Sequence, residues 1–343
     1  MKSELYKPNN IRRDSNMELL RIISMLLVLI VHADFMSLGP PNLTDTINFP
    51  FSAFSRFLIE SFSIVCVNVF ILISGWYGIH VKWGRLIEFV FQVLFFGLSI
   101  YIIFRLLGLT EKWEASEWIG LICFRREIWF VNAYIVLYVF SPVLNLFAEK
   151  SSKRQFEIVI ISFFILQLMF GFIRSEVYFS KGYSPLSFFG LYLLARYIRT
   201  YPSSITDKHK YHDISIYLCL SILVACMAFL VVKFSLCDVW LIYAYTSPFV
   251  IVSSLFFFLF FTKITIYARC INWIASSVFA VYLLHTDPLF FETYYLQPIR
   301  EWYRVDNAFL FVAHITSLIV FVFVVSIIMD KIRIMLYNFI TRR

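Results

Sequence analysis

Ten apolar segments separated by short polar stretches divide this sequence. They lie at about residues 18–38, 57–77, 86–108, 128–147, 156–173, 184–199, 214–232, 242–261, 272–290 and 307–329. Most are close to the ~20 residues that a helix needs to cross a bilayer. The linkers leave no room for a separate soluble domain. The pattern predicts an all-α fold, a polytopic membrane bundle of about ten transmembrane helices. It forms one domain over residues 1–343, with a short basic cytoplasmic tail at residues 1–16.

Two of the ten segments are less regular than the others. The sixth segment is short, which predicts a tilted or partly interfacial helix. The ninth segment contains several polar residues, and Asp287 and Pro288 follow His285 directly. Because proline cannot continue a regular helix, we expect the ninth helix to end or bend there.

Composition supports the membrane assignment. Sixty per cent of the residues are hydrophobic, 15% are charged and 40 are Phe, and mean hydropathy is +0.78. Soluble domains hold about 25% charged residues. The net charge of +8 does not indicate nucleic-acid binding, because the basic residues form short clusters between apolar segments. The six cysteines show no metal-ligand spacing, so we expect no metal.

The distribution of basic residues predicts the orientation. With the N-terminus in the cytoplasm, the inside segments hold 19 Lys and Arg residues and the outside segments hold 9. Residues 39–55, an outside loop in this arrangement, contain neither residue type. The positive-inside rule therefore predicts an N-in, C-in protein with an even number of spans.

The first segment carries ionisable residues at unusual depth. Arg21 and His32 are 11 residues apart, close to three helical turns, so both leave one helix face about 16 Å apart along the axis. Glu18 precedes Arg21 by three residues. Ionisable residues inside a membrane are candidate functional sites. Two alternatives stay open, in which His32 is a neutral hydrogen-bonded packing residue and Arg21 is a cytoplasmic anchor.

Small and basic residues gather after the second segment. Ser74 and Gly75 interrupt its cytoplasmic end, where they allow either close helix packing or a ligand against free backbone N–H groups. Lys82 and Arg85 share one face of a helix that starts there, and such a pair suits phosphate groups. Ordinary anchoring by positive charge explains them equally well.

Polar and aromatic residues in later segments are further candidates. Trp129 and Tyr138 lie in the fourth segment, where an aromatic belt is as good an explanation for Trp129 as a binding site. His285 brings a second imidazole into the membrane, and it could meet His32 at one cavity. A structural histidine remains the favoured interpretation of His285 and of His314 near the outer end of the last segment.

In this order, these motifs resemble the acyltransferase 3 family of membrane O-acyltransferases, which includes surface polysaccharide O-acetyltransferases. The matching motifs are Arg21-x10-His32, Phe70-x-Leu72-x-Ser74-Gly75, Lys82-x-x-Arg85, Trp129-Phe130 with Tyr138 and Ser141-Pro142, and Tyr282-Leu-Leu-His285. Lys82 departs from the family, where arginine is frequent at this position. A lysine cannot form the bidentate hydrogen bonds that a guanidinium forms with phosphate.

The resemblance implies a reaction. Members of the family move an acyl group, usually acetyl, from cytoplasmic acyl-CoA to a hydroxyl of a cell-surface or envelope polysaccharide. Such a transfer needs a base for the hydroxyl proton and a group that stabilises the oxyanion. We therefore expect acetyl-CoA as acyl donor, a saccharide or lipid-linked glycan as acceptor, and a multi-pass location in the bacterial cytoplasmic membrane. A homodimer stays open.

The resemblance also assigns roles to residues. His32 is the expected general base, and a histidine-bound acyl intermediate stays open. The expected catalytic group is His32, Arg21 and Glu18. The expected acyl-CoA site is Arg21, Lys82, Arg85, Ser74 and Gly75. The expected acceptor site is Trp129, Tyr138 and His285.

Two functions of other classes compete with this one. A transporter or flippase for an envelope glycan or small solute would use the Arg21 and His32 face as a proton relay. No inverted repeat of the kind common in transporters is visible in the sequence. A non-catalytic scaffold would not need either residue.

Overall fold

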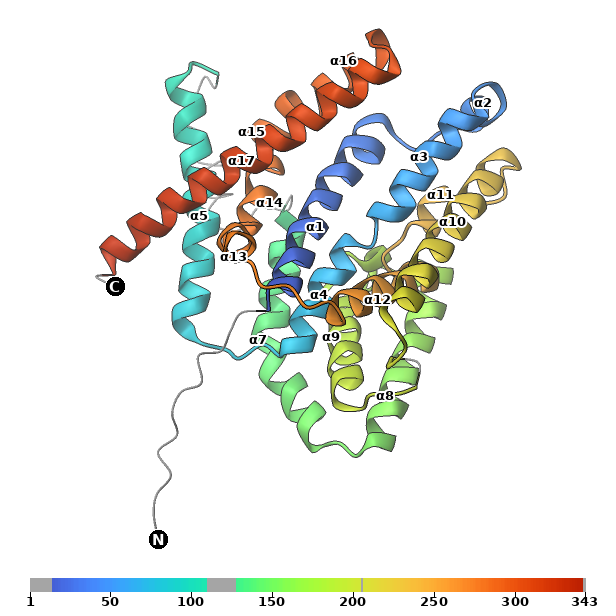
Figure 1. Cartoon of the computed structure of the whole chain (residues 1–343), viewed down its shortest axis with the longest axis vertical. Coiled ribbons are helices and arrows are strands. Elements are labelled where there is room, and N and C mark those ends of the chain that lie inside the picture. The colour runs from blue at the N-terminus through green and yellow to red at the C-terminus, as the bar shows by residue number, and fades with distance from the viewer. Residues whose placement is uncertain (1–13, 110–127, 205, 342–343) are drawn as a thin grey trace.

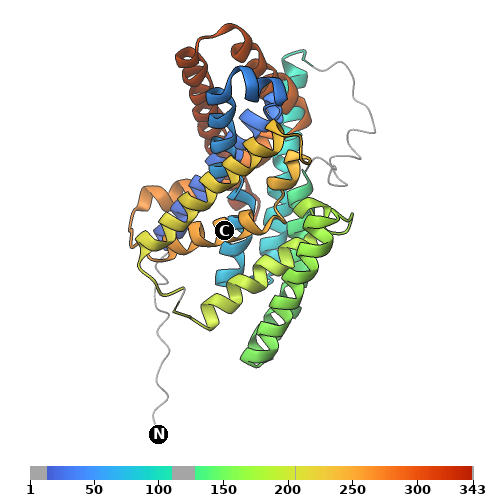
Figure 2. The ribbon, with the colours of Figure 1, turned by 90° about the vertical axis from the view of Figure 1, so that its right-hand side faces the viewer.

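The computed structural model describes residues 14–109, 128–204 and 206–341. Every regular element in these ranges is a helix, and the helices pack side by side as a bundle (Figures 1 and 2). The predicted basic tail at residues 1–16 lies mostly outside the described residues. The predicted all-α class is confirmed.

Seven helical segments are long and apolar enough to cross a membrane. They are α1 (Ser15–Val31) with the π-helical turn η1 (His32–Met36), α3 (Pro50–Ser63) with α4 (Cys66–Tyr77), α5 (Trp83–Leu106), α7 (Trp129–Lys150), α8 (Lys153–Leu166) with η3 (Gln167–Ile173), α10 (Lys210–Lys233) and α17 (Ala308–Ile340). These apolar helices make the chain a multi-pass integral membrane protein.

The ninth predicted segment is broken. Helices α13 (Arg269–Ala275) and α14 (Phe279–His285) meet α15 (Pro288–Phe290), η5 (Phe291–Leu296) and α16 (Gln297–Val305) at a bend of 61°. The bend falls at residues 286–287, directly before Pro288, as predicted. Counted as one span, this bent pair raises the number of candidate spans to eight.

The helices of the sixth and eighth segments are shorter than the hydrocarbon core of a bilayer is thick. The sixth segment was predicted to be short. Helix α9 (Pro185–Thr200) has 16 residues and α12 (Pro248–Thr262) has 15, so each is about 22–24 Å long against a hydrocarbon core of about 30 Å. The predicted boundary of 242–261 was wrong because α11 (Val239–Ile242) and a turn precede Pro248.

The predicted loop 39–55 is also partly helical. It contains α2 (Leu43–Asn48), and α3 begins at Pro50 rather than near residue 57. Asn42 caps α2 by accepting a hydrogen bond from the Asp45 N–H at 3.0 Å. This cap explains a short polar helix that hydropathy alone does not reveal.

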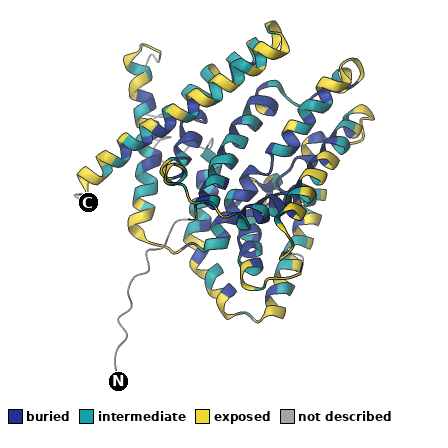
Figure 3. Cartoon of the chain, viewed as in Figure 1, coloured by how far each residue is buried: buried dark blue, intermediate teal, exposed yellow. Residues whose placement is uncertain are grey.

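Helix α4 lies at the centre of the bundle, packed against α1, α9 and α12. Buried residues concentrate there in Figure 3, and the outer helix faces are exposed. A Cβ atom on Gly75 would lie 2.4 Å from the Tyr192 carbonyl oxygen of α9. Glycine at this position therefore permits the close approach of α4 and α9, as small residues do in membrane bundles.

Buried ion pairs connect helices that are distant in sequence. Arg56 on α3 donates to Asp34 at 2.6 Å, and Lys263 after α12 donates to Asp213 on α10 at 2.5 Å. Within α17, Arg333 bonds Asp330, which also accepts a hydrogen bond from Gln92 on α5 at 2.8 Å. Pairing reduces the free energy cost of charge in the interior.

Candidate active site

A cavity of about 190 Å³ lies between α1, α3, α4, α7, α11 and α14. It is smaller than the ~300–1,000 Å³ of typical ligand pockets, so it suits the reacting end of a substrate. Met36 and Trp240 at one part of its wall are exposed, whereas Glu60 and Tyr245 are buried. The cavity therefore runs from the surface into the bundle.

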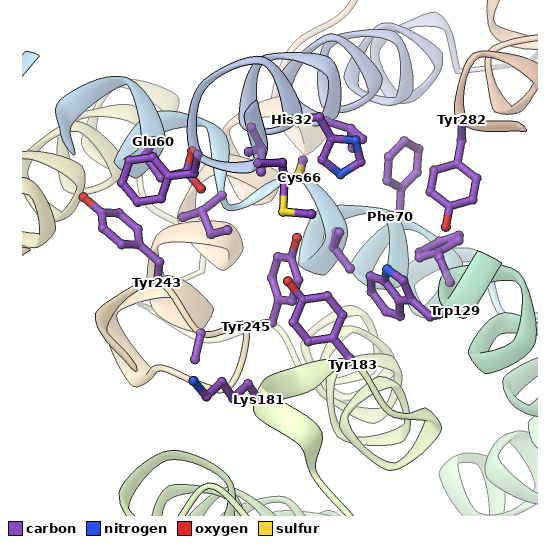
Figure 4. Close-up of a pocket in the computed structure, with 18 of the residues that line it drawn as sticks. His32, Glu60, Cys66, Phe70, Trp129, Lys181, Tyr183, Tyr243, Tyr245 and Tyr282 are labelled. Atoms are coloured by element: carbon purple, nitrogen blue, oxygen red, sulfur yellow. The ribbon is translucent and has the colours of Figure 1, made fainter. Parts of the chain in front are cut away.

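The wall of the cavity is mostly aromatic, with few polar groups (Figure 4). Trp129 contacts Tyr183 at a ring-centroid distance of 4.5 Å, and Tyr183 contacts Tyr245 at 5.2 Å. Burial raises the pKa of Tyr183 to about 12. Its phenol is therefore protonated at neutral pH and available as a hydrogen-bond donor.

His32 lines this cavity at the point where α1 changes into the π-helical turn η1. Such turns are frequent at functional sites. His32 Nδ1 lies 2.9 Å from Nε2 of His285 on α14, and His285 is fully buried. The two rings are 253 residues apart in sequence. The structure thus brings together the two intramembrane histidines identified in the sequence.

The hydrogen bonds define which nitrogen carries each proton in the neutral pair. His285 Nδ1 lies 2.5 Å from the carbonyl oxygen of Val281, which can only accept. His285 therefore donates from Nδ1, and its Nε2 lone pair accepts from His32 Nδ1. The remaining nitrogen, His32 Nε2, then carries a lone pair. This lone pair belongs to a residue of the cavity wall.

Arg21 and Glu18 lie at the other end of α1. Arg21 donates from Nη1 to both carboxylate oxygens of Glu18 at 3.1 Å, and its side chain is 34% exposed. Met25 and Val28 lie between Arg21 and His32 on the same face and line the cavity, but Arg21 is not part of the cavity wall.

Other cations gather at the Arg21 end. Arg21 and Arg199 both lie close enough to Tyr77 for their charges to act on its hydroxyl. The Arg199 guanidinium stacks on Trp76 at 5.3 Å. Lys82 caps the start of α5, and both it and Arg85 are exposed.

Tyr138 lies at this end rather than at the cavity. Its hydroxyl accepts a hydrogen bond from the Lys82 N–H at 2.9 Å and donates to the Lys82 carbonyl oxygen at 3.1 Å. Tyr138 and Arg85 also line one small pocket. Tyr138 therefore holds the loop that presents the two cations, and it is distant in the fold from Trp129 in the cavity wall.

Ser74 and Gly75 are explained by packing within the bundle. Ser74 donates to the Phe70 carbonyl oxygen at 3.0 Å and lies 3.5 Å from the Tyr134 hydroxyl. Gly75 faces Tyr192 on α9. His314 Nδ1 lies 2.7 Å from the Asp306 carboxylate, and its ring contacts Trp302 in a tilted arrangement.

A family model described as an acyltransferase domain matches residues 14–331 of the chain. The chain belongs to the acyltransferase 3 family. Neither a curated protein nor a solved structure matches it. The family makes this protein an acyltransferase, and the reaction requires an acyl donor. In this acyltransferase, His32 and His285 place a hydrogen-bonded imidazole pair at the wall of a cavity that reaches into the bundle.

Sequence reasoning missed several residues of the acyltransferase that line the cavity. Glu60 lies inside the predicted second span, so the rule that flagged Arg21 and His32 also applies to it. Tyr183 and Tyr245 lie in connecting segments between helices, and no local pattern distinguishes them from other tyrosines. Lys181, at the cavity wall, forms an ion pair with Asp238 at 3.2 Å.

Proposed function

We propose that this acyltransferase moves an acetyl group from cytoplasmic acetyl-CoA to a hydroxyl of a cell-surface or envelope polysaccharide, with His32 as general base. The observation that supports this proposal most directly is the hydrogen-bond chain from the Val281 carbonyl through His285 to His32. These hydrogen bonds leave a lone pair on His32 Nε2 at the cavity wall, where it can accept the proton that acyl transfer to a hydroxyl releases.

In the proposed reaction, His32 Nε2 takes the proton of the acceptor hydroxyl as its oxygen attacks the thioester carbonyl. The new C–O bond forms, the C–S bond breaks, and the proton passes from His32 to the departing CoA sulfur. His285 stabilises the imidazolium of His32 by accepting its Nδ1 proton in a hydrogen bond. Phenols in the cavity wall, such as Tyr183 and Tyr282, supply donors for the oxyanion.

The cations at the other end of α1 would hold the CoA phosphates. Arg21, Lys82 and Arg85 offer charge-assisted hydrogen bonds to phosphate oxygens. The ~16 Å along α1 between Arg21 and His32 is about the length of an extended pantetheine arm. Met25 and Val28 offer an apolar path between the two ends.

We propose the N-in, C-in topology for this arrangement. Seven long helices and one bent pair give eight candidate passes, and the total is ten if the shorter α9 and α12 cross a locally thinned or polar-lined region. The Arg21 end of α1 then faces the cytoplasm, where acetyl-CoA is made. The exposed part of the cavity wall at Met36 and Trp240 lies in the outer half, where a surface glycan arrives.

The test is turnover of radiolabelled acetyl-CoA by the purified full chain in lipid nanodiscs, with an extract of envelope glycans as acceptor. We expect CoA release that depends on the extract, and glycans that gain the mass of an acetyl group. The proposal would be wrong if the protein consumed no acetyl-CoA but transported a glycan across the membrane of reconstituted vesicles. The protein would then be a transporter.

A further inference from the structure

Glu60 on α3 differs from the other buried acidic residues. Its side chain is 1% exposed, and it forms neither a hydrogen bond nor an ion pair with the described residues, so its buried Oε2 atom has no partner. In residues 14–109, 128–204 and 206–341, each other buried acidic side chain has a hydrogen bond or ion pair through at least one oxygen, although Asp34 Oδ2 and Asp213 Oδ1 also lack a hydrogen bond. They are Glu18 with Arg21, Asp34 with Arg56, Asp213 with Lys263, Asp287 with the Leu289 N–H, and Asp330 with Arg333.

A buried carboxyl group without a hydrogen bond is unfavourable, because it has lost its hydrogen bonds to water and nothing replaces them. Arg56 is one helical turn away, but its guanidinium is bonded to Asp34 and to the Gly39 carbonyl oxygen. No hydrogen bond from the described residues therefore reaches Glu60, and its carboxyl group is available to a ligand in the adjoining cavity.

Glu60 lies in the wall of the cavity that also contains His32. In Figure 4, Glu60 and Tyr243 lie on one side of the cavity and Trp129 and Tyr282 on the other, with His32 along the edge between them. A group bound in the cavity would therefore meet a carboxyl on one side and aromatic faces on the opposite side.

This combination matches the two kinds of surface on a sugar ring. The C–H face of a sugar packs on aromatic side chains, and its hydroxyl edge donates hydrogen bonds to carboxylate oxygens. We propose that Glu60 binds a hydroxyl of the acceptor saccharide and thereby places a neighbouring hydroxyl at His32. This inference rests on the proposed acetyl transfer and adds the residue that recognises the acceptor.

The test compares Glu60→Gln with the wild-type chain in nanodiscs. The acceptor probes are methyl glycosides of glucose, galactose, mannose and N-acetylglucosamine. Gln167→Met is the matched control, because Gln167 is a buried side chain with unpaired polar atoms that does not line the cavity. Thermal unfolding of each variant reports any loss of stability.

We expect Glu60→Gln to raise the KM for the preferred glycoside up to about tenfold, because the amide oxygen of Gln still accepts a hydrogen bond but a weaker one than a carboxyl group does. The KM for acetyl-CoA and the unfolding temperature should stay at the wild-type values. Gln167→Met should leave both KM values unchanged. The readout separates acceptor recognition from a structural role, because a structural role would change the KM for acetyl-CoA and the unfolding temperature as well.

Direct binding provides the second measurement. Trp129 and Trp240 line the cavity, so the same glycosides should quench tryptophan fluorescence in the wild type and more weakly in Glu60→Gln. Equal saccharide affinity and turnover in both proteins would overturn the role of Glu60. A wild type that acetylates only alcohols without a sugar ring would overturn it too, while acyl transfer stands. Saccharide binding without any acetyl-CoA consumption would instead overturn the proposed reaction.

Discussion

The two ends of α1 hold their polar groups in different ways. At the His32 end, the imidazole is oriented by a buried histidine and faces an aromatic cavity. At the Arg21 end, the guanidinium is one-third exposed and lies near other cations on exposed loops and helix ends. The first arrangement fixes the position and tautomer of one ring. The second concentrates positive charge without fixing single atoms.

This difference suggests that one end of α1 serves the acyl-transfer step and the other end serves binding of the donor. Orientation in a low-dielectric cavity acts on the transition state, whereas a cluster of exposed cations binds an anionic donor equally in ground and transition states. Substitutions at the His32 end should therefore lower kcat, and substitutions at the Arg21 end should raise the KM for acetyl-CoA. The predictions below test this division.

The largest effect is expected for His32→Ala. Removal of a general base typically lowers kcat on the order of 10²- to 10⁴-fold. The measurement is acetyl transfer by purified protein, with acetyl-CoA binding as control. Normal transfer by a His32→Ala chain that is correctly inserted in the membrane would show that the ring has only a packing role.

Substitution of His285 tests the proposed proton arrangement. His285→Leu removes the hydrogen-bond acceptor of His32 Nδ1. We expect kcat to fall on the order of 100-fold, because nothing then keeps the proton of His32 on Nδ1 or holds its ring in place. His285→Gln should retain more activity, since an amide can accept from His32 and donate to the Val281 carbonyl. Equal loss in both variants would contradict the hydrogen-bond chain. The pH dependence of kcat, measured under the same conditions for both proteins, should also differ between His285→Leu and the wild type.

A smaller effect is expected at the cationic end. Arg85→Ala should raise the KM for acetyl-CoA about tenfold with little change in kcat, the magnitude of one exposed charge-assisted hydrogen bond. The effect should weaken at high salt. Lys153→Ala is the control, because Lys153 is also exposed and lies at the start of α8. The same increase in both variants would indicate non-specific attraction.

The smallest effect on chemistry is expected at Gly75. Gly75→Ala should lower stability by about 1–3 kcal/mol, because the added carbon meets the Tyr192 carbonyl oxygen. Gly84→Ala is the control, since a Cβ there meets nothing within 4 Å. Thermal unfolding distinguishes the two. A Gly75→Ala chain of normal stability with a raised KM for acetyl-CoA would instead support the donor-site role expected from the sequence.

Hydropathy located the apolar helices of the bundle, but it did not give all of their boundaries or reveal the short helix α2. All ten apolar segments contain helix, and Asp287 with Pro288 marked the bend correctly. Hydropathy overestimated the eighth segment because a window of apolar residues does not register the turn before Pro248. It missed α2, whose stability depends on a cap and on packing rather than on apolar length.

The candidate site was predictable only in part. Arg21 and His32 stood out because ionisable residues are rare in apolar segments, and Glu60 met the same criterion. Trp129 was ambiguous because interfacial and binding aromatics look alike in sequence. The separation of Tyr138 from Trp129 depends on how α7 passes along the bundle, with one end at the cavity and the other at Lys82.

The sequence by itself determined that this protein consists of membrane helices and that Arg21 and His32 share a face. Both results follow from local physics, because backbone groups in lipid must bond within their own segment and the helix repeat is constant. The tertiary structure alone decided that His285 meets His32 and that Glu60 has no hydrogen bond from the described residues. These contacts depend on how helices distant in the sequence pack and bend, which no local pattern of residues specifies.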